Sequence, residues 1–241
     1  MNYFGPKKSL APVQRQKIML TEKSPFAIQE AFKELRTNVM FSLPGTGCKC
    51  VGVTSPTPGD GKSTSAANLA ISLAQIGKRV ILIDCDMRLP TVAESFRIPA
   101  VPGLSDFLSG QAAVDACVRQ VERYQLSVMP AGSIPPDPTG LLEDAQMDRL
   151  INAFRSVYDY VIVDLPPVMA VPDASILSKY IDGFLLVIRN RQTRHRYVTE
   201  MIRRLQLTKS KIIGFSVVGG DLSSKKYYKN KYGRGYDQVQ R

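Results

Sequence analysis

The sequence predicts an α/β fold in which helices cover both faces of a doubly wound, mostly parallel sheet. Short apolar runs without polar alternation recur along the 241 residues, as expected for strands that are buried on both faces. Helical patterns separate most of these runs, and this alternation is typical of a parallel sheet. The expected strands are residues 50–54, 80–84, 126–129, 161–164, 184–188 and 212–218.

The expected helices fill the intervals between these strands. The first begins with Ser24 as its N-cap and Pro25 at its first helical position, and it ends near Phe41. The second occupies about residues 62–76 and is ended by Gly77. The remaining helices are expected near residues 104–118, 140–156, 173–180 and 193–207.

The chain divides into three parts. Residues 1–23 are polar and are expected to form an N-terminal arm, residues 24–221 form the domain, and residues 222–241 form a flexible tail. No apolar run reaches the length of a membrane span, and the N-terminus has no signal-peptide core, so we expect a cytoplasmic protein. The four cysteines fit no zinc or disulfide framework and are expected to be reduced, buried thiols.

The net charge of +11 is concentrated in two segments. Residues 189–211 contain eight lysines and arginines against one glutamate, and residues 222–241 contain six against one aspartate. Such basic surfaces could meet nucleic acid, anionic lipid or an acidic partner.

A glycine-rich loop joins the first expected strand to the second expected helix. Residues 56–64 read PTPGDGKST, which fits the phosphate-binding pattern G-x-x-x-x-G-K-[ST] except that Pro56 replaces the first glycine. Glycines let backbone N–H groups turn toward phosphate oxygens, and the helix N-terminus adds a partial positive charge. Lys62 would reach the β- and γ-phosphates, and the Ser63 hydroxyl would ligate magnesium. The predicted cofactors are therefore ATP and Mg²⁺, bound by Gly59, Asp60, Gly61, Lys62, Ser63 and Thr64.

Three aspartates follow apolar strands. Asp84 and Asp86 come at the end of one strand, and Asp164 ends another in the manner of a Walker B acid. Ligands of open α/β sheets bind at the carboxyl ends of the strands, and alternation along an extended chain would point Asp84 and Asp86 to the same side. A single aspartate at such a position is more often a helix cap or a turn residue. Their joint occurrence with a phosphate loop instead favours a magnesium and phosphate site.

These motifs together resemble the cytoplasmic bacterial tyrosine kinases (BY-kinases) that accompany capsular and exopolysaccharide synthesis. Residues 83–90 (IDCDMRLP) match that family's second motif, hydrophobic-D-x-D-x-R-x-P. Residues 24–42, 68–70, 77–78 and 132–142 are also similar to the family, and the resemblance covers about residues 20–241. Since the family is similar in fold to the MinD/ParA branch of P-loop NTPases, the resemblance implies that fold here.

The resemblance also implies roles for the candidate catalytic residues, Lys62, Asp84, Asp86 and Asp164. Asp84 would orient and deprotonate a tyrosine hydroxyl, and Asp86 would support it and the water shell of the metal. Asp164 would serve magnesium, so the expected metal ligands are Ser63, Asp84 and Asp164. Positioning and charge neutralisation should supply most of the acceleration.

The expected phosphate acceptors lie in the tail. Four of the ten tyrosines fall within ten residues, namely Tyr227, Tyr228, Tyr232 and Tyr236, and the family autophosphorylates such a cluster. Without the upstream motifs, an aromatic and basic tail would suggest binding to nucleic acid or membrane. Each phosphotyrosine adds ~1.5–2 negative charges, which would cancel or invert the positive charge of the tail and repel it from the nucleotide-filled site.

The expected partners also come from the resemblance. Glu30, Lys33 and Arg36 resemble the family's E-x-x-R-x-x-R helix motif, which builds a ring of subunits such as an octamer. Lys33 replaces the first arginine and lacks its planar two-pronged contact. The family further implies a separate membrane adaptor, a polysaccharide co-polymerase, that recruits the kinase to the inner face of the plasma membrane. A cognate tyrosine phosphatase would reset the tail, and no nucleic-acid partner is expected.

Two other functions remain open from the sequence. A MinD/ParA-like ATPase switch would lack kinase activity, but such relatives carry a second lysine where this loop has Thr57 and Pro58. The second open function is that of a basic protein that binds nucleic acid, although the sequence shows no evident recognition module. In the family an asparagine usually helps to hold the adenine base, but Val217, Val218 and Gly219 occupy that neighbourhood here. The expected preference for ATP over GTP therefore comes from the resemblance and not from these residues.

Overall fold

The structure is a computed structural model that describes residues 19–220. Its centre is a seven-stranded sheet with the strand order β3-β4-β2-β5-β1-β6-β7. Only β3 is antiparallel to its neighbour, β4, so the predicted doubly wound and mostly parallel sheet is confirmed. The strands are β1 (Lys49–Thr54), β2 (Val80–Asp84), β3 (Arg119–Val121), β4 (Leu126–Met129), β5 (Tyr160–Asp164), β6 (Gly183–Arg189) and β7 (Ile212–Val218).

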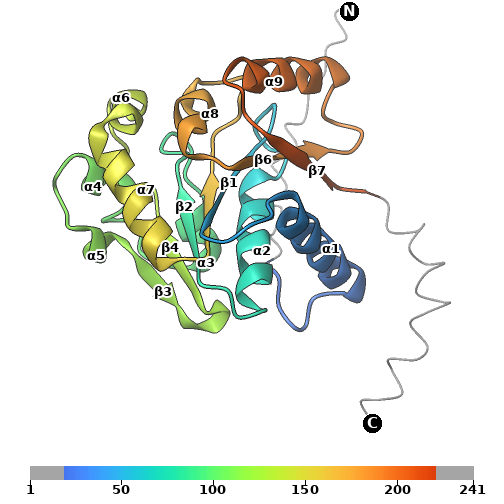
Figure 1. Cartoon of the computed structure of the whole chain (residues 1–241), viewed down its shortest axis with the longest axis horizontal. Coiled ribbons are helices and arrows are strands. Elements are labelled where there is room, and N and C mark those ends of the chain that lie inside the picture. The colour runs from blue at the N-terminus through green and yellow to red at the C-terminus, as the bar shows by residue number, and fades with distance from the viewer. Residues whose placement is uncertain (1–18, 221–241) are drawn as a thin grey trace, which may run out of the picture.

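Helices cover both faces of this sheet (Figure 1). One face packs against α1, α2 and α3, and the other packs against the helices from α4 to α9. The α-helices are α1 (Phe26–Ser42), α2 (Lys62–Ala74), α3 (Val92–Phe96), α4 (Leu104–Leu108), α5 (Val114–Cys117), α6 (Pro138–Glu143), α7 (Ala145–Val157), α8 (Asp173–Ile176) and α9 (His195–Leu207). Two 3₁₀ turns, η1 (Glu122–Tyr124) and η2 (Leu177–Tyr180), complete the described elements.

The central strands supply side chains to two separate cores. In β2, Ile81 and Ile83 face the core under α7, while Val80 and Leu82 face the core under α2. Successive strand residues point to opposite faces, so a strand covered on both sides must be apolar at every position. This explains why the sequence showed apolar runs without alternation.

Several short elements differ from the sequence prediction. The expected helix at 104–118 is two helices, α4 and α5, because Gly110 adopts a positive φ of 75° between them. The helix expected at 140–156 divides at Asp144, whose carboxylate accepts a hydrogen bond from the Gln146 amide and caps α7. Helix α3 and the edge strand β3 were not predicted, since neither exceeds five residues.

The N-terminal end of the described chain is held more firmly than predicted. Leu20, within the expected arm, is only 2% exposed, and its amide donates to Asn68 Oδ1 at 2.7 Å. Helix α1 has Pro25 as its N-cap, and the Ser24 hydroxyl accepts from the Thr21 amide instead of capping the helix. The prediction of Ser24 as N-cap is therefore wrong, because a preceding turn uses its hydroxyl.

The predictions for the cysteines, for membrane spans and for the two ends of the chain have different outcomes. Cys50, Cys85 and Cys117 are buried free thiols, as expected, and Cys48 is half-buried. Between residues 19 and 220, none of the helices combines the length and apolar character that crossing a membrane requires. Residues 1–18 and the predicted tail lie outside the described residues.

Glycine is required where α4 approaches the loop after β4. A Cβ on Gly103 would lie 2.4 Å from both Gly132 N and Pro130 O. These are backbone atoms, and the adjacent Leu104 amide donates to Pro130 O, so they cannot withdraw easily. We expect Gly103→Ala to lower the free energy of unfolding by ~1–3 kcal/mol, as measured by urea denaturation.

Gly220→Ala is the matched control, because its Cβ would meet nothing within 4 Å. Its free energy of unfolding should stay within ~0.5 kcal/mol of the parent. Equal stability of the two variants would contradict the close approach at Gly103.

Candidate functional site

The phosphate loop, residues 56–64, connects β1 to the first turn of α2. Gly59 and Gly61 have φ values of 83° and 103°, a region that strongly favours glycine. Pro56, where the pattern has a glycine, is not among the residues with a positive φ. Helix α2 begins at Lys62 without a side-chain cap, so the free N–H groups of its first turn suit an anion.

Lys62 lies at the centre of a buried charge cluster. Its Nζ is 2.8 Å from Asp86 Oδ2, 3.4 Å from Asp164 Oδ1 and 3.1 Å from Ser63 Oγ. Burial by itself would lower the pKa of Lys62, but Asp164 and Asp86 outweigh it and raise the pKa. The structure therefore brings together four side chains that the sequence assigned to one site.

Asp164 fits a divalent cation. It is fully buried, and its Oδ2 has no hydrogen-bond partner among residues 19–220. Burial raises its pKa, and Lys62 together with a hydrogen bond from Ser63 opposes that shift. Within the same residues no cluster of three or more metal-ligating side chains occurs. One carboxylate beside a serine hydroxyl matches Mg²⁺, which keeps several waters and shares phosphate ligands.

Asp84 has a structural role that the sequence interpretation did not include. Its Oδ1 accepts from the Asp86 amide, and its Oδ2 accepts from the amides of Thr91 and Val92, each at 3.1 Å. The carboxylate thus caps α3 from the end of β2. Burial and the nearby charge of Asp164 raise the pKa of Asp84 to about 7. Asp84 and Asp86 lie together, but only Asp86 pairs with Lys62.

Asp60 braces the loop from within. Its Oδ2 accepts from the amide and the hydroxyl of Thr57, and its Oδ1 accepts from the Thr193 hydroxyl at 2.7 Å. The side chain therefore holds the loop to a distant segment, while any contact with phosphate would fall to the backbone. Thr64, also predicted to bind nucleotide, is partly exposed on the first turn of α2.

Sequence reasoning missed a polar chain beside the cluster. Arg88 Nη2 donates to Thr139 Oγ1 at 3.0 Å, and that hydroxyl lies 3.1 Å from Asp173 Oδ1. Asp173 is 1% exposed, and burial raises its pKa. Arg88 and the stretch at 132–142 had each been singled out by resemblance, but only the fold shows that they meet.

The three residues of the expected oligomer motif do not share one free surface. Lys33 and Glu30 form an exposed ion pair at 2.8 Å on α1. Arg36 instead points to α2 of its own chain, where its Nη1 donates to Ser72 O at 2.7 Å. The four tail tyrosines lie outside the described residues.

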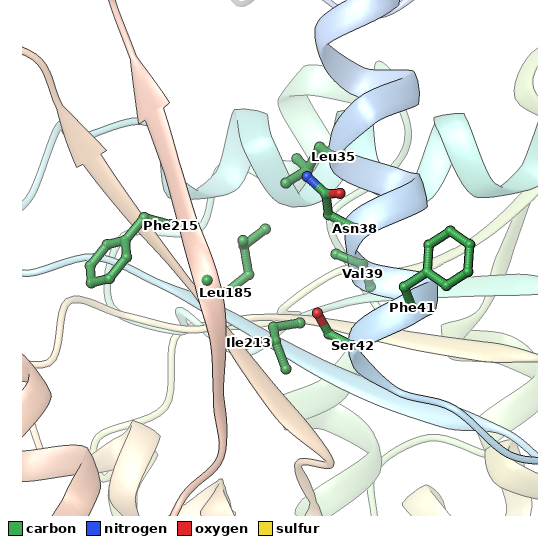
Figure 2. A pocket seen from close by; sticks show the side chains of 9 residues that line it. Leu35, Asn38, Val39, Phe41, Ser42, Leu185, Ile213 and Phe215 are labelled. Atoms are coloured by element: carbon green, nitrogen blue, oxygen red, sulfur yellow. The ribbon is translucent and has the colours of Figure 1, made fainter.

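A groove between α1 and the edge of the sheet lies apart from this cluster (Figure 2). In Figure 2, Leu35 and Val39 of α1 face Leu185 of β6 and Ile213 of β7, whereas Phe215 points away from the helix. None of its lining residues belongs to the phosphate loop or the three carboxylates, so this groove is not the nucleotide site.

Comparisons with known proteins identify the family of the chain. The model of the AAA domain family matches residues 48–213. The tyrosine-protein kinase YwqD of Bacillus subtilis (strain 168) is 38% identical over 216 residues, which cover 90% of this chain and 91% of that protein. The chain belongs to the bacterial tyrosine-protein kinases.

Solved structures support both the family and the fold of this bacterial tyrosine kinase. The kinase domain of Escherichia coli tyrosine kinase ETK is 29% identical with a TM-score of 0.78, and 86% of each chain is covered. The septum site-determining protein MinD of Pyrococcus horikoshii OT3, solved with Mg-ADP, has a TM-score of 0.60 at 20% identity, covering 70% of this chain and 69% of that one. This second likeness shows the fold alone, and it agrees with the predicted α/β P-loop fold.

The raised pKa of Asp84 predicts a pH dependence of stability. Between the ordinary aspartate pKa of 3.8 and about 7, the folded chain holds a proton that the unfolded chain has released. The free energy of unfolding should therefore fall as pH rises through this range. In urea denaturation at pH 5 and pH 7, Asp84→Asn should show a smaller fall than the parent.

Asp115→Asn, which changes an exposed aspartate of α5, should keep the parental pH dependence. If Asp84→Asn and the parent lost equal stability between the two pH values, the proton would not reside on Asp84.

Proposed function

We propose that this chain is an ATP-dependent autokinase that phosphorylates its own C-terminal tyrosine cluster and thereby regulates capsular or exopolysaccharide synthesis and export. The observation that carries the proposal is the convergence of Lys62, Asp86 and Asp164 beside the phosphate loop. A buried lysine between two carboxylates, next to uncapped helix N–H groups, suits the binding of a metal-bound polyphosphate.

The residues around the loop would have different roles in binding the nucleotide and the metal. Backbone N–H groups of residues 59–64 would surround the phosphates, and Lys62 would exchange its carboxylate partners for phosphate oxygens. Ser63 and the unpartnered Oδ2 of Asp164 would hold Mg²⁺, with Asp84 contributing through its position opposite Asp164 in the sheet. When bound, Mg²⁺ would neutralise the charge that develops on the transferred phosphoryl group.

Asp84 is our candidate for the group that accepts the tyrosine proton. A carboxyl group with a pKa of about 7 is well matched to proton transfer near neutral pH. Its backbone hydrogen bonds fix its orientation. Asp86 would keep the neighbouring charge balance, because it is the carboxylate closest to Lys62.

The acceptor and partner assignments rest on the resemblance described above. Tyr227, Tyr228, Tyr232 and Tyr236 would receive the γ-phosphate, in trans between the subunits of a ring. A membrane adaptor would recruit the kinase from the cytoplasm to the inner face of the plasma membrane and activate it. A cognate phosphatase would remove the phosphates.

A MinD/ParA-like ATPase switch is the alternative function. The shared fold with MinD favours it, because one fold can serve unrelated activities. The two functions differ in the fate of the γ-phosphate, which a switch releases to water and a kinase transfers to protein.

Transfer to the tail can be measured with labelled ATP and magnesium, with and without a fragment of the adaptor. The parent should incorporate label into the tail tyrosines, and changing all four tyrosines to phenylalanine should abolish it. Lys62→Met should lower incorporation by more than ~100-fold, because it removes a preorganised cation from the phosphates. Lys23→Met, at an exposed lysine, should label normally.

If label never reaches the tail tyrosines while inorganic phosphate is released, the ATPase switch is correct and the autokinase is not.

Assembly into a ring can be measured by light scattering. Glu30 and Lys33 are exposed on α1, so Glu30→Ala should reduce the mass of the parental assembly. Glu34→Ala, also exposed on α1, is the matched control and should leave the mass unchanged. A parental mass that Glu30→Ala does not alter would exclude this face of α1 from the assembly.

A further inference from the structure

Two hydrogen bonds tie the phosphate loop to the turn between β6 and α9. Arg189 Nε, at the end of β6, donates to the carbonyl oxygen of Gly59 at 2.9 Å. Thr193 Oγ1, just before α9, donates to Asp60 Oδ1 at 2.7 Å. These contacts join residues that are about 130 positions apart in the sequence. We call these four residues the loop latch.

Thr193 is the centre of the loop latch, because its hydroxyl both accepts and donates a hydrogen bond. It accepts a hydrogen bond from the Arg189 amide at 2.8 Å while it donates to Asp60. The Thr193 amide in turn donates to the Arg189 carbonyl at 2.9 Å. The turn is thereby closed on itself, and its hydroxyl is fixed toward the carboxylate of Asp60.

Asp60 connects the turn to the phosphate loop. The residue is 4% exposed, and its other oxygen holds both the amide and the hydroxyl of Thr57. The Asp60 carboxylate therefore links Thr193 to the start of the loop, while Arg189 holds the carbonyl of Gly59 between them. A Cβ on Gly61 would lie 3.4 Å from Arg189 Nη2, so the guanidinium also lies against the far end of the loop.

The loop has a physical need for such support. Gly59 and Gly61 both have positive φ values, and glycine loses more conformational freedom on ordering than any other residue. An anion site made from backbone N–H groups binds well only if those groups are already aligned, since aligning them on binding costs affinity.

We infer that Arg189 and Thr193 are positioning residues that hold the phosphate loop in its nucleotide-binding conformation through Gly59 and Asp60. This inference rests on the proposed nucleotide site, and it assigns a function to the turn before α9. Loss of the Thr193 hydroxyl leaves a buried acceptor on Asp60 unsatisfied and removes one of the two bonds between the loop and the turn.

The variants that test the loop latch differ by single atoms. Thr193→Val removes the hydroxyl and keeps the shape, and Thr193→Ser keeps the hydroxyl. Thr199→Val makes the same change at an exposed threonine of α9, whose hydroxyl donates to the His195 carbonyl of its own helix. Each variant is measured for binding of a fluorescent ADP analogue with magnesium, for its thermal midpoint, and for amide hydrogen exchange of residues 57–61 without nucleotide.

We expect Thr193→Val to weaken binding of the ADP analogue about tenfold and to speed exchange of the Thr57 amide, with the thermal midpoint lowered by only a few degrees. Thr193→Ser should restore both properties, and Thr199→Val should behave as the parent.

Unchanged exchange in Thr193→Val, or equal losses in Thr193→Val and Thr193→Ser, would overturn the loop latch. Faster exchange in Thr193→Val together with no ADP binding by the parent would support the loop latch and reject the proposed nucleotide site.

Discussion

The parallel pairing of β2, β5 and β1 at the centre of the sheet is the constraint on which the rest of the structure depends. In this register, Asp84 lies opposite Asp164, and Asp164 lies opposite Val53, just before the phosphate loop. Because the carboxyl ends of parallel strands lie at the same edge of the sheet, the loop and the carboxylates meet there although they are far apart in the sequence.

The same burial makes the charges at this edge depend on one another. A buried charge is costly unless it is paired, and Lys62 pairs with both Asp86 and Asp164. Burial, and after it the charge of Asp164, raises the pKa of Asp84. The backbone amides around Asp84 stabilise its carboxylate form and so oppose that shift, and they fix the loop that leads to α3. Charge balance and local folding are therefore linked at the same residues.

The long, strongly patterned elements were predictable, whereas the short ones were not. The strands β1, β2, β4, β5, β6 and β7 were expected within one residue of their observed ends, because each buries a continuous apolar run. Helix α3 and strand β3 are too short to carry a period, and they form because Asp84 caps α3 and β4 offers its edge to β3. At Arg36, a motif residue expected at a subunit interface, the structure adds a contact within the chain that the sequence did not show, a hydrogen bond to the Ser72 carbonyl.

The sequence by itself determined the fold class, the phosphate loop and the identity of the carboxylates, because these depend on local spacing and on the chemistry of side chains. Only the tertiary structure decided which side chain each of them contacts. It paired Asp86 rather than Asp84 with Lys62, and it placed Thr193 against Asp60 across about 130 residues. Such contacts depend on where strands end in space, and neither spacing nor composition records that position.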